Sequence, residues 1–588
     1  MRIRERAKFY ARRIREGRLK QMRRQIRWIY GYARHYWKEM CFYTALGMGG
    51  VLLGLVSSLI SRDMVDIVTG MKTGQLARTF GWMIGMSLAS IIVNQITSYF
   101  SNRISYQVDA EIKADIFEKI MVTDWESVTQ YHTGDLLTRW SSDASNISSG
   151  VLSFIPSLII NVFKFAGTLW LVIRSDWTFA VFALLGIPFS MLMSRTLLTR
   201  MQNQNEKNAA MSAKMSGFNQ ETFSNIQTIK AFDLIHRYIS RLKGLQKEYI
   251  DMQLSYARMT MGSSILLGLI GLAVTYSSYG WGIYRVFTGA ITYGTMTMFL
   301  SLSGNLTGSV NALASLIPGL ISLTTSAGRL MDIVEMPRED YSQTDEACEF
   351  LECHRAEGIG IEVEDLSYAY RTGTTVFKDV SFYARPHEII GLVGPSGEGK
   401  TTMLRLLLAL LKPAGGSIRL AAGRDRMPVT PATRIMFSCV PQGNTMFSGT
   451  IAENMRNVAP DATDEDIIAA LKLACAWNFV SRLPDGIRTK IRERGGGFSE
   501  GQAQRLSIAR ALMRRAPILL LDEASSALDV ATEREVLRNI MTDSYPRVVI
   551  VTTHRPTVLS MCTRVYQIRD LTCTKLDRDQ IEKLIRDF

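Results

Sequence analysis

The apolar residues of this chain are concentrated in long runs within the first half of the sequence. Each run holds about 20 residues, the length that a helix needs to cross the roughly 30 Å of hydrocarbon in a bilayer. Six such runs can be placed, at residues 41–61, 80–100, 149–172, 177–197, 259–283 and 291–318. The last third of the chain has the mixed composition of a water-soluble domain. The pattern predicts a helical membrane domain with six spans, followed by one soluble domain.

The segment before the first run is strongly basic. Its first forty residues contain 14 Lys or Arg against three Glu, and the aromatic residues Trp28, Tyr30, Tyr32, Tyr36 and Trp37. A basic stretch next to a span is typical of the cytoplasmic side of a membrane. We therefore expect residues 1–38 to form an interfacial helix rather than an arm that binds nucleic acid. A cleaved signal peptide fits poorly, because the first apolar run is long and a second follows soon after.

The topology and the cysteines place the soluble domain in the cytoplasm. Six spans that start from a cytoplasmic N-terminus return the chain to the cytoplasm. Most of the seven cysteines lie in the soluble part, and their spacing resembles a metal site only at Cys348, Cys353 and His354. Three ligands in a linker make a weak case for zinc. We expect a multi-pass protein of the cytoplasmic membrane whose soluble domain faces a reducing compartment.

The sequence between the spans suggests how the domains are connected. The connections after the second and fourth spans, 101–148 and 198–258, are long and read as polar helices with apolar periodicity. This periodicity breaks at 124–136 and at 217–232. From Ile361 onward, apolar strands alternate with helical segments, which predicts an α/β domain. The expected boundaries are 1–38 for the interfacial segment, 39–336 for the membrane domain, 337–358 for an acidic, loop-like linker and 359–588 for the α/β domain.

Polar residues recur at helical spacing within three of the predicted spans. In the third span they are Ser157, Asn161, Lys164 and Thr168. Similar stripes occur at Ser87, Ser90, Asn94 and Thr97 in the second span and at Gly304, Gly308, Asn311 and Ser315 in the sixth. One interpretation is a water-accessible cavity with Lys164 on its wall, since a charge in mid-bilayer is costly unless it meets water or a partner. The alternative is hydrogen bonding and close packing between helices, with Lys164 snorkelling or paired.

A glycine-rich loop lies between an apolar run and a helical segment of the soluble domain. The sequence GPSGEGKTT comprises Gly394, Pro395, Ser396, Gly397, Glu398, Gly399, Lys400, Thr401 and Thr402. It matches the phosphate-binding loop pattern, in which glycines let backbone N–H groups surround phosphate oxygens. In that pattern Lys400 reaches the β and γ phosphates and Thr401 is a ligand of Mg²⁺. The strand–loop–helix context makes this match specific, and it predicts an ATP site.

Two acidic residues follow a second buried strand. In ILLLDEASSALD (518–529), the apolar run ends at Asp522, which is placed to hold the Mg²⁺ shell. Glu523 comes next, where a carboxylate can orient and deprotonate an attacking water. A solvated acidic cap on a core strand is the alternative, and it is less convincing beside a complete phosphate loop.

A third motif resembles a second anion site. GGGFSEGQAQRLSIARA (495–511) places small residues directly before a helical run. The free N–H groups at such a helix start, with Ser499 and Gly501, can bind a phosphate. One chain thus carries two phosphate-binding motifs about a hundred residues apart.

Taken together, these motifs closely resemble the ATP-binding cassette (ABC) transporters, specifically half-transporters of the exporter type with a type IV membrane domain. FSEGQAQR (498–505) resembles the signature motif of that family, and VPQGNTMFSGTIAEN (440–454) resembles its Q-loop, with Gln442. Tyr370 corresponds to the residue that stacks on adenine, Asp529 belongs to the D-loop and His554 corresponds to the switch histidine.

The resemblance implies roles for these residues. Glu523, His554 and Gln442 would act in ATP hydrolysis, and Thr401, Gln442 and Asp522 would hold Mg²⁺. Ser499, Gly501 and Gln502 would close over nucleotide bound by the phosphate loop of a second chain, so function would require a dimer. The segments near 124–136 and 217–226 would act as coupling helices that dock on the cassettes, and Glu493 would belong to the X-loop.

Two residues depart from the family signature: Phe498 stands in place of Leu, and Glu500 in place of a glycine. Glu500 brings a carboxylate near the phosphates, although its N–H group remains. We expect ATP-driven export of a drug, lipid or peptide by a homodimer in the bilayer. The alternatives are one half of a heterodimer with a homologous half-transporter, and an ATP-gated channel or regulator. The sequence does not identify the cargo.

Overall fold

The computed structural model describes residues 18–181, 207–208, 211–212, 214–443, 445–492 and 496–587. The chain divides into two compact units. Unit 1 comprises Met1–Met121 and Tyr131–Met336, and unit 2 comprises Val122–Gln130 and Pro337–Phe588.

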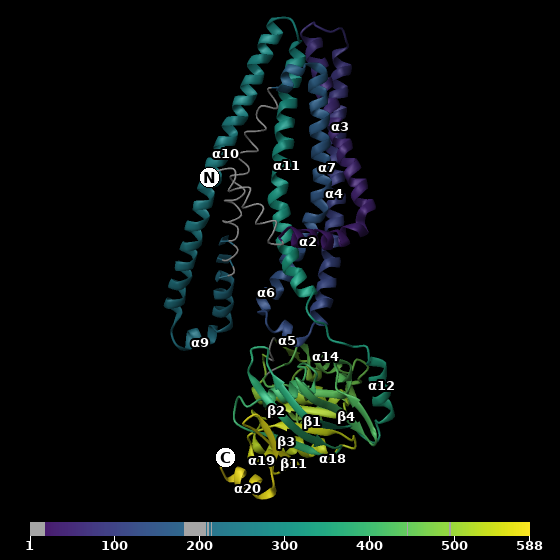
Figure 1. Cartoon of the computed structure of the whole chain (residues 1–588), viewed down its shortest axis with the longest axis vertical. Coiled ribbons are helices and arrows are strands. Elements are labelled where there is room, and N and C mark those ends of the chain that lie inside the picture. The colour runs from purple at the N-terminus through teal and green to yellow at the C-terminus, as the bar shows by residue number, and fades with distance from the viewer. Residues whose placement is uncertain are drawn as a thin grey trace. The chain divides into compact units, whose positions relative to one another are not determined.

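Unit 1 is helical, and its long helices are drawn as extended rods in Figure 1. Helices α3, α4, α7 and α11 pack against one another, and α10 packs against α11. The described elements are α2 (Arg18–Ala33), η1 (Arg34–Tyr36), α3 (Trp37–Val68), α4 (Leu76–Met121), α6 (Thr133–Thr138), η2 (Arg139–Asp143), α7 (Ala144–Ser175), α9 (Ile226–Ala231), α10 (Ile235–Phe287) and α11 (Tyr293–Val334).

Three helices in the described part of the chain are long and apolar enough to cross a membrane: Arg23–Val68, Leu76–Met121 and Thr133–Ser175. In the second of these, 0% of the apolar window is buried inside the unit. This window of Leu76–Met121 therefore exposes its apolar side chains on the outside of the unit. A surface of this kind is stable in contact with lipid, whereas in water it would form a large exposed apolar patch. The predicted fifth and sixth spans fall within α10 and α11. Most of the predicted fourth span, 177–197, lies outside the described residues.

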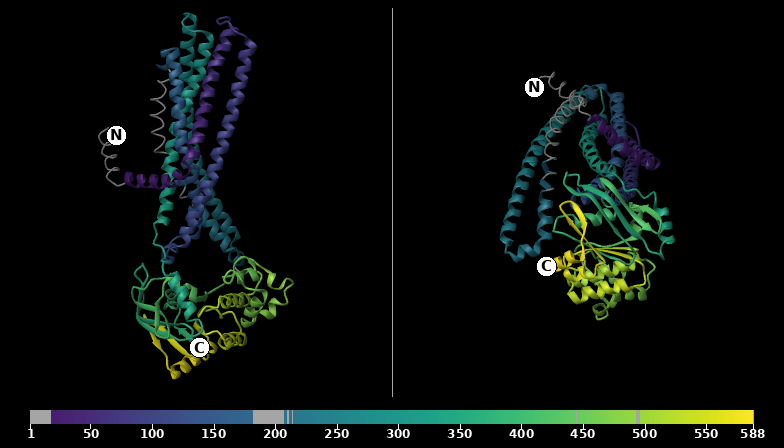
Figure 2. Two further views of the ribbon diagram at one scale, coloured as in Figure 1. Left: turned by 90° about the vertical axis from the view of Figure 1, so that its right-hand side faces the viewer. Right: turned by 60° about the horizontal axis from the view of Figure 1, so that its bottom comes forward.

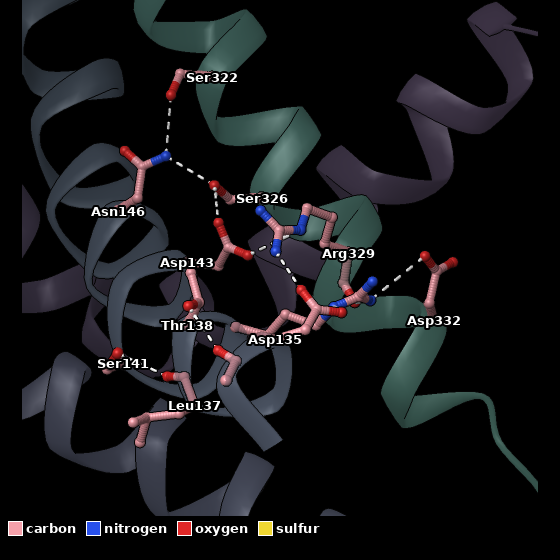
Figure 3. Close-up of polar contacts among 12 residues, drawn as sticks. Asp135, Leu137, Thr138, Ser141, Asp143, Asn146, Ser322, Ser326, Arg329 and Asp332 are labelled. Atoms are coloured by element: carbon pink, nitrogen blue, oxygen red, sulfur yellow. Dashed lines mark hydrogen bonds and ion pairs between the residues drawn. The ribbon is translucent and has the colours of Figure 1, made fainter. Parts of the chain in front are cut away.

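A polar cluster joins α7 to α11 (Figure 3). Arg329 donates to Asp135 at 2.8 Å, and its Nε lies 3.3 Å from Asp143. Ser326 donates to Asp143 at 2.9 Å and accepts a hydrogen bond from Asn146 at 2.8 Å. Asp143 ends the π-helical turn η2, and its side chain is only 11% exposed. Because removing one partner would leave a buried charge uncompensated, this cluster fixes α7 and α11 in one arrangement.

The start of α11 is fixed to α3 by a second buried carboxylate. Asp66 accepts hydrogen bonds from the Gly294 N–H and from the Thr292 hydroxyl, both at 2.9 Å. A carboxylate at a helix N-terminus satisfies unpaired N–H groups and interacts favourably with the helix dipole. The approach is so close that only glycine fits, since a Cβ on Gly294 would lie 2.3 Å from the Arg62 carbonyl oxygen.

Unit 2 contains two main β-sheets, which lie next to each other in Figure 2. An antiparallel sheet has the order β2-β1-β4-β5, and a six-stranded sheet has the order β12-β11-β3-β10-β9-β6. The strands are β1 (Gly360–Ala369), β2 (Thr375–Ala384), β3 (Ile389–Val393), β4 (Gly415–Ala422), β5 (Asp425–Pro428), β6 (Phe437–Val440), β7 (Gly449–Thr450), β8 (Lys490–Ile491), β9 (Ile518–Asp522), β10 (Val548–Thr552), β11 (Arg564–Arg569) and β12 (Thr572–Lys575).

Helices complete unit 2. They are α5 (Trp125–Val128), α12 (Thr344–Cys353), α13 (Lys400–Leu407), η3 (Pro431–Met436), α14 (Ile451–Arg456), α15 (Asp464–Leu473), α16 (Trp477–Val480), η4 (Gly486–Arg488), α17 (Glu500–Met513), α18 (Val530–Thr542), α19 (Pro556–Leu559) and α20 (Arg578–Asp587). Every residue of β3, β9 and β10 is buried. Continuous apolar strands of this kind form the centre of a parallel sheet covered on both faces. The α/β class expected from the sequence is confirmed.

Two segments differ from the local structure expected of them. The acidic segment 337–358 was expected to be a loop, but it contains α12, and Ala347 is fully buried in the core of unit 2. Its acids Asp345 and Glu346 stand in the first helical turn, where they favour a helix rather than a loop. The second expected break, 217–232, is helical through residue 224; the turn comes at Asn225, followed by the short helix α9.

We predict that Gly294→Ala destabilises unit 1, because the new methyl group would overlap the Arg62 carbonyl and Asp66. Overlap of this kind costs about 1–3 kcal/mol, so the melting temperature of the detergent-solubilised protein should fall by several degrees. Gly304→Ala on the same helix is the control, since a Cβ there would meet nothing within 4 Å. Equal melting temperatures for the two variants would show that the contact is not tight.

Candidate functional site

Four neighbouring parallel strands of unit 2 carry the predicted site residues at their carboxyl ends. In the order β3-β10-β9-β6, these ends lead into the 394–402 loop, His554, Asp522 with Glu523, and Gln442. The register aligns them, because Thr552 of β10 pairs with both Leu392 of β3 and Asp522 of β9. Open α/β sheets bind ligands at this edge. Residues more than 100 positions apart are thereby brought into one region.

The 394–402 loop has the backbone shape of a phosphate cradle. Gly394, Gly397 and Gly399 have φ values of +153°, +92° and +105°, which other residues rarely adopt. A Cβ on Gly394 would lie 2.1 Å from the Ile568 carbonyl oxygen. Helix α13 starts at Lys400, so the N–H groups of its first turn have no partner inside the helix. The loop and helix start therefore fit an anion.

Lys400 lies inside this loop. Its Nζ donates to the carbonyl oxygens of Gly394 at 2.7 Å and Pro395 at 3.0 Å, and the residue is only 7% exposed. Burial lowers the pKa of Lys400, and the nearby carboxylates of Glu523 and Asp522 partly offset this effect. The ammonium is thus held by oxygen acceptors of the kind that a phosphate group provides.

Glu523, Gln442 and His554 meet at the same edge. Gln442 donates to Glu523 at 2.7 Å, and His554 Nε2 lies 3.7 Å from the other carboxylate oxygen of Glu523. Glu523 has a φ of +48°, a backbone conformation that is costly for a residue with a side chain and that concentrates at functional sites. Burial, and then the charge of Lys400, lower the pKa of His554, so its imidazole is mostly neutral at pH 7.

The donors expected for Mg²⁺ are an alcohol, an amide and a carboxylate, from Thr401, Gln442 and Asp522. Asp522 is buried, and one of its oxygens accepts a hydrogen bond from Thr552 at 2.8 Å. Within the described residues no group of three or more His, Cys, Asp or Glu side chains is placed to hold a metal ion. Few protein ligands, all of them oxygens, suit Mg²⁺, which is usually shared with substrate phosphates and water. The residues fit this ion.

Tyr370, the expected adenine-stacking residue, is joined to the start of α13. Its hydroxyl lies 2.9 Å from the Thr402 hydroxyl, and its ring packs edge-to-face on Tyr368 with 5.1 Å between centroids. The ring therefore has a fixed position beside the phosphate loop.

The signature segment forms the start of α17. Ser499 is the N-cap residue: its hydroxyl accepts from the Gln502 N–H at 3.3 Å, and its own N–H donates to the Gln502 side chain at 3.0 Å. A Cβ on Gly501 would lie 2.7 Å from the Ala527 carbonyl oxygen. Glu500 is exposed in the first helical turn. In the part of the chain that the structure describes, no hydrogen bond or ion pair joins Ser499, Gly501 or Gln502 to the 394–402 loop.

The D-loop segment connects the signature helix to the region of His554. Gln504 of α17 donates to the Ser526 hydroxyl at 3.1 Å and accepts from the Ala527 N–H at 3.0 Å. Arg555, next to His554, donates to the Leu528 carbonyl at 2.6 Å and to the Ser526 carbonyl. Neither Gln504 nor Arg555 was assigned a role from the sequence, because their partners in the 526–528 segment are backbone and hydroxyl groups that only the fold brings near.

Asp529, the remaining D-loop residue, serves locally as the N-cap of α18. Its carboxylate accepts from the Thr532 N–H at 2.9 Å and from the Thr532 hydroxyl at 2.7 Å. These hydrogen bonds lower the pKa of Asp529, with the backbone bond as the largest cause. Glu493, assigned to the X-loop by resemblance, lies outside the described residues.

Arg371, which sequence reasoning missed, binds the segment 122–130 within unit 2. Its guanidinium lies 3.2 Å from the Asp124 carboxylate and 3.3 Å from that of Glu126, and it donates to the Ser127 hydroxyl at 3.2 Å. Glu126 and Ser127 belong to α5. Because Arg371 directly follows Tyr370, the residue expected at adenine is covalently joined to the residue that holds α5.

A second connection runs from the same segment to the far end of the phosphate-loop helix. Asp124 N–H donates to the Pro337 carbonyl at 2.9 Å. Two residues further, Glu339 forms a two-point ion pair with Arg434 at 2.6 and 2.7 Å. Arg434 also donates to the Leu408 carbonyl, directly after α13, at 2.7 Å. Both ends of α13 are therefore linked to the segment that carries α5.

Comparison with known proteins supports this organisation. A family model described as "ABC transporter transmembrane region" matches residues 40–310, and one described as "ABC transporter" matches residues 377–526. A protein of Lactococcus lactis subsp. lactis named "Multidrug resistance ABC transporter ATP-binding and permease protein" is 27% identical over 546 residues, covering 88% of each chain. A "Fatty acid ABC transporter ATP-binding/permease protein" of Mycobacterium tuberculosis is 26% identical, covering 84% of this chain and 78% of that one.

A solved structure confirms the fold. It is described as "Structure of a bacterial Atm1-family ABC exporter with ATP bound", and it matches with a TM-score of 0.78 at 20% identity, covering 94% of this chain and 96% of that one. The two family models together match more than half of the chain and in the order predicted from its motifs. The chain belongs to the ABC transporters, as a membrane region fused to an ATPase cassette that couples ATP to transport.

Proposed function

We propose that the chain is an exporter that moves a small amphipathic cargo out across the cytoplasmic membrane by alternating access, and that it works as a pair of identical chains. The single observation that carries this proposal is the alignment of the phosphate loop, Asp522, Glu523, Gln442 and His554 along one sheet edge. All the groups expected for hydrolysis on the phosphate-loop side are present in one cassette. The multidrug and fatty-acid names of two relatives agree with an amphipathic cargo.

Within this proposal each residue has a distinct task. Lys400 and the N–H groups of α13 hold phosphate oxygens, and Tyr370 holds the adenine ring. Thr401, Gln442 and Asp522 would hold Mg²⁺, which when bound neutralises negative charge on the phosphates. Glu523 orients and deprotonates the attacking water, and the hydrogen bond from Gln442 holds one of its carboxylate oxygens in place. The neutral imidazole of His554 is able to donate a hydrogen bond to the γ-phosphate.

The signature supplies the argument for a pair of chains. Ser499, Gly501 and Gln502 form the start of a helix that suits an anion, and the hydrogen bonds of Ser499 and Gln502 are to each other. A second copy can place this helix start over the phosphate loop of the first. In such a pair, the exposed Glu500 side chain would add a carboxylate to each contact between a signature helix and the phosphate loop of the other chain.

Transmission to the membrane domain is proposed to pass through two segments, 124–136 and 217–226. For the first, the ion pairs of Arg371 and the backbone hydrogen bonds that Pro337 and Glu339 form with residues 122–124 hold this segment to the cassette. The second segment ends at the turn at Asn225, which the short helix α9 follows.

We predict that Glu523→Gln retains ATP binding but lowers ATPase activity by about 10²- to 10⁴-fold, the range that a general base contributes. The charge that deprotonates water is lost, whereas Gln442 can still hydrogen-bond the new amide. Phosphate release and nucleotide binding by the purified protein measure the two effects. Glu465→Gln, at an exposed position of α15, is the control. Unchanged phosphate release in the Glu523 variant would contradict the assigned role.

Mixing two inactive variants tests the pairing. Lys400→Ala disables the phosphate loop, and Ser499→Glu places a second negative charge where the partner's phosphates would lie. In a mixed pair, one site receives both defects and the other receives neither. Co-purified mixed pairs should therefore hydrolyse ATP faster than either variant alone. No gain over the parents would argue against a functional pair of identical chains and in favour of a heterodimer.

We predict that the contact between Arg371 and α5 is needed to couple cargo binding to ATP hydrolysis. Arg371→Gln removes both ion pairs, so cargo should stimulate the ATPase less and transport should fall severalfold, while ATP binding persists. Exchanging the charges, with Arg371→Asp and Asp124→Arg together, should restore part of the coupling. Arg419→Gln, which breaks the exposed pair with Glu364, is the matched control. Normal cargo stimulation in the Arg371 variant would exclude this contact from transmission.

A further inference from the structure

The predicted spans contain an unbalanced positive charge. Across all six of them the charged residues are Lys164 and Arg195, and there is no Asp or Glu. Arg195 is two residues from the end of its span and lies outside the described residues. A second copy of the chain would bring the same two cations and no acid. The charge of Lys164 therefore has no carboxylate partner within the spans of either chain.

The position of Lys164 along α7 makes it difficult for its ammonium group to reach the water at a membrane surface. At 1.5 Å per residue, it lies about 16 Å from the Ser175 end of the helix and about 30 Å from the Ala144 end. Side chains on a helix lean toward its N-terminus. The lysine stem therefore leans toward the more distant end, so snorkelling to the nearer membrane surface is disfavoured.

Lys164 also lies away from the lipid-facing side of the helix. The large apolar residues on the exposed face of α7 are Ile155, Leu158, Ile159, Val162, Trp170 and Ile173, each at least 40% exposed. Lys164 comes two residues after Val162, which is about 200° around the helix. It is half-buried, and Thr168 one turn further is fully buried. The lysine thus belongs to the side of α7 that packs toward other helices of unit 1, among them α3, α4 and α11.

The polar neighbours of Lys164 do not neutralise its charge. Asn161 donates to the Ser157 carbonyl at 2.8 Å, and the Thr168 hydroxyl donates to the Lys164 carbonyl at 2.6 Å. Both side chains are uncharged and donate to the backbone of α7, so neither can balance a positive charge. Among the described residues no ion pair includes the Lys164 ammonium.

Helix α11, the neighbour of α7, presents an exposed polar stripe. Ser301, Gly304, Gly308, Asn311 and Ser315 recur at helical spacing and are all exposed. A stripe of this kind is unsuited to contact with lipid tails and suits a water-containing cavity or a polar ligand. Together, the two helices combine one cation with hydrogen-bonding groups and apolar side chains.

We propose that Lys164 binds the anionic head group of the transported amphiphile, a carboxylate, phosphate or sulfate. This assignment rests on the exporter function proposed above and names its class of cargo. The negative head group compensates the ammonium in a region of low dielectric, where an unpaired charge is costly. The apolar tail of the cargo lies against the apolar side chains of the spans. A cationic amphiphile of the same length is repelled.

Cargo-stimulated ATPase of the full-length protein in phosphatidylcholine nanodiscs tests the proposal. The probes share a twelve-carbon tail: dodecanoate and dodecyl phosphate are anionic, dodecyl trimethylammonium is cationic and dodecyl maltoside is neutral. The wild type should respond to the anions at the lowest concentration. Lys164→Ala should raise the half-maximal concentration for the anions at least ten-fold, Lys164→Arg should restore it, and Lys164→Glu should favour the cationic probe. Lys247→Ala, at an exposed position on α10, is the control.

The outcomes separate this proposal from the exporter function. Equal responses to all four head groups, unchanged by Lys164→Ala, would overturn the anion site and leave the exporter intact. No response and no transport of any probe by the wild type would overturn the exporter function itself. Adding phosphatidylglycerol to the nanodiscs distinguishes the source of the anion. A Lys164-dependent response to this lipid without added probe would assign the site to a lipid head group. Rescue by Lys164→Arg excludes misfolding as the cause.

Discussion

The parallel pairing of β3, β10, β9 and β6 is the constraint on which the catalytic arrangement depends. Their register places Leu392, Thr552 and Asp522 at one level, so the loops that follow must emerge at the same edge. The strands are largely apolar and buried, as expected for a parallel sheet that is covered on both faces. Burial of these strands therefore fixes the distances between polar groups that follow them. A slip of one residue would separate Asp522 from Thr552.

Around this edge, local strain and local hydrogen bonds set the finer geometry. Glu523 stays in a left-handed conformation, which costs about 1–3 kcal/mol, because its N–H donates to the Thr552 hydroxyl at 2.9 Å. Gln442 and His554 then flank its carboxylate. The same principle governs unit 1, where Asp66 and the Arg329 cluster fix the helices at buried polar contacts within a largely apolar bundle.

The cassette also contains short connections between the region of the nucleotide site and residues 122–130. Tyr370 and Arg371 are adjacent in sequence, yet one contacts the phosphate-loop helix and the other contacts α5. At the other end of α13, Arg434 and Glu339 lead back to the same segment. The two ends of α13 are thus each connected to residues 122–130 through a short series of contacts.

The sequence by itself determined the family, the α/β class of the cassette and the identity of the phosphate loop, because those features depend on local composition and on strict spacing of glycine, lysine and acids. It located the cation of Lys164 and the absence of acids in the spans. Only the tertiary structure brought Gln442 to Glu523, placed Arg371 on α5 and made the acidic segment 337–358 part of the cassette with its own helix. These contacts join residues 81 to 245 positions apart. Such pairs leave no periodic signal, since strand order and helix packing, rather than local pattern, decide which distant residues meet.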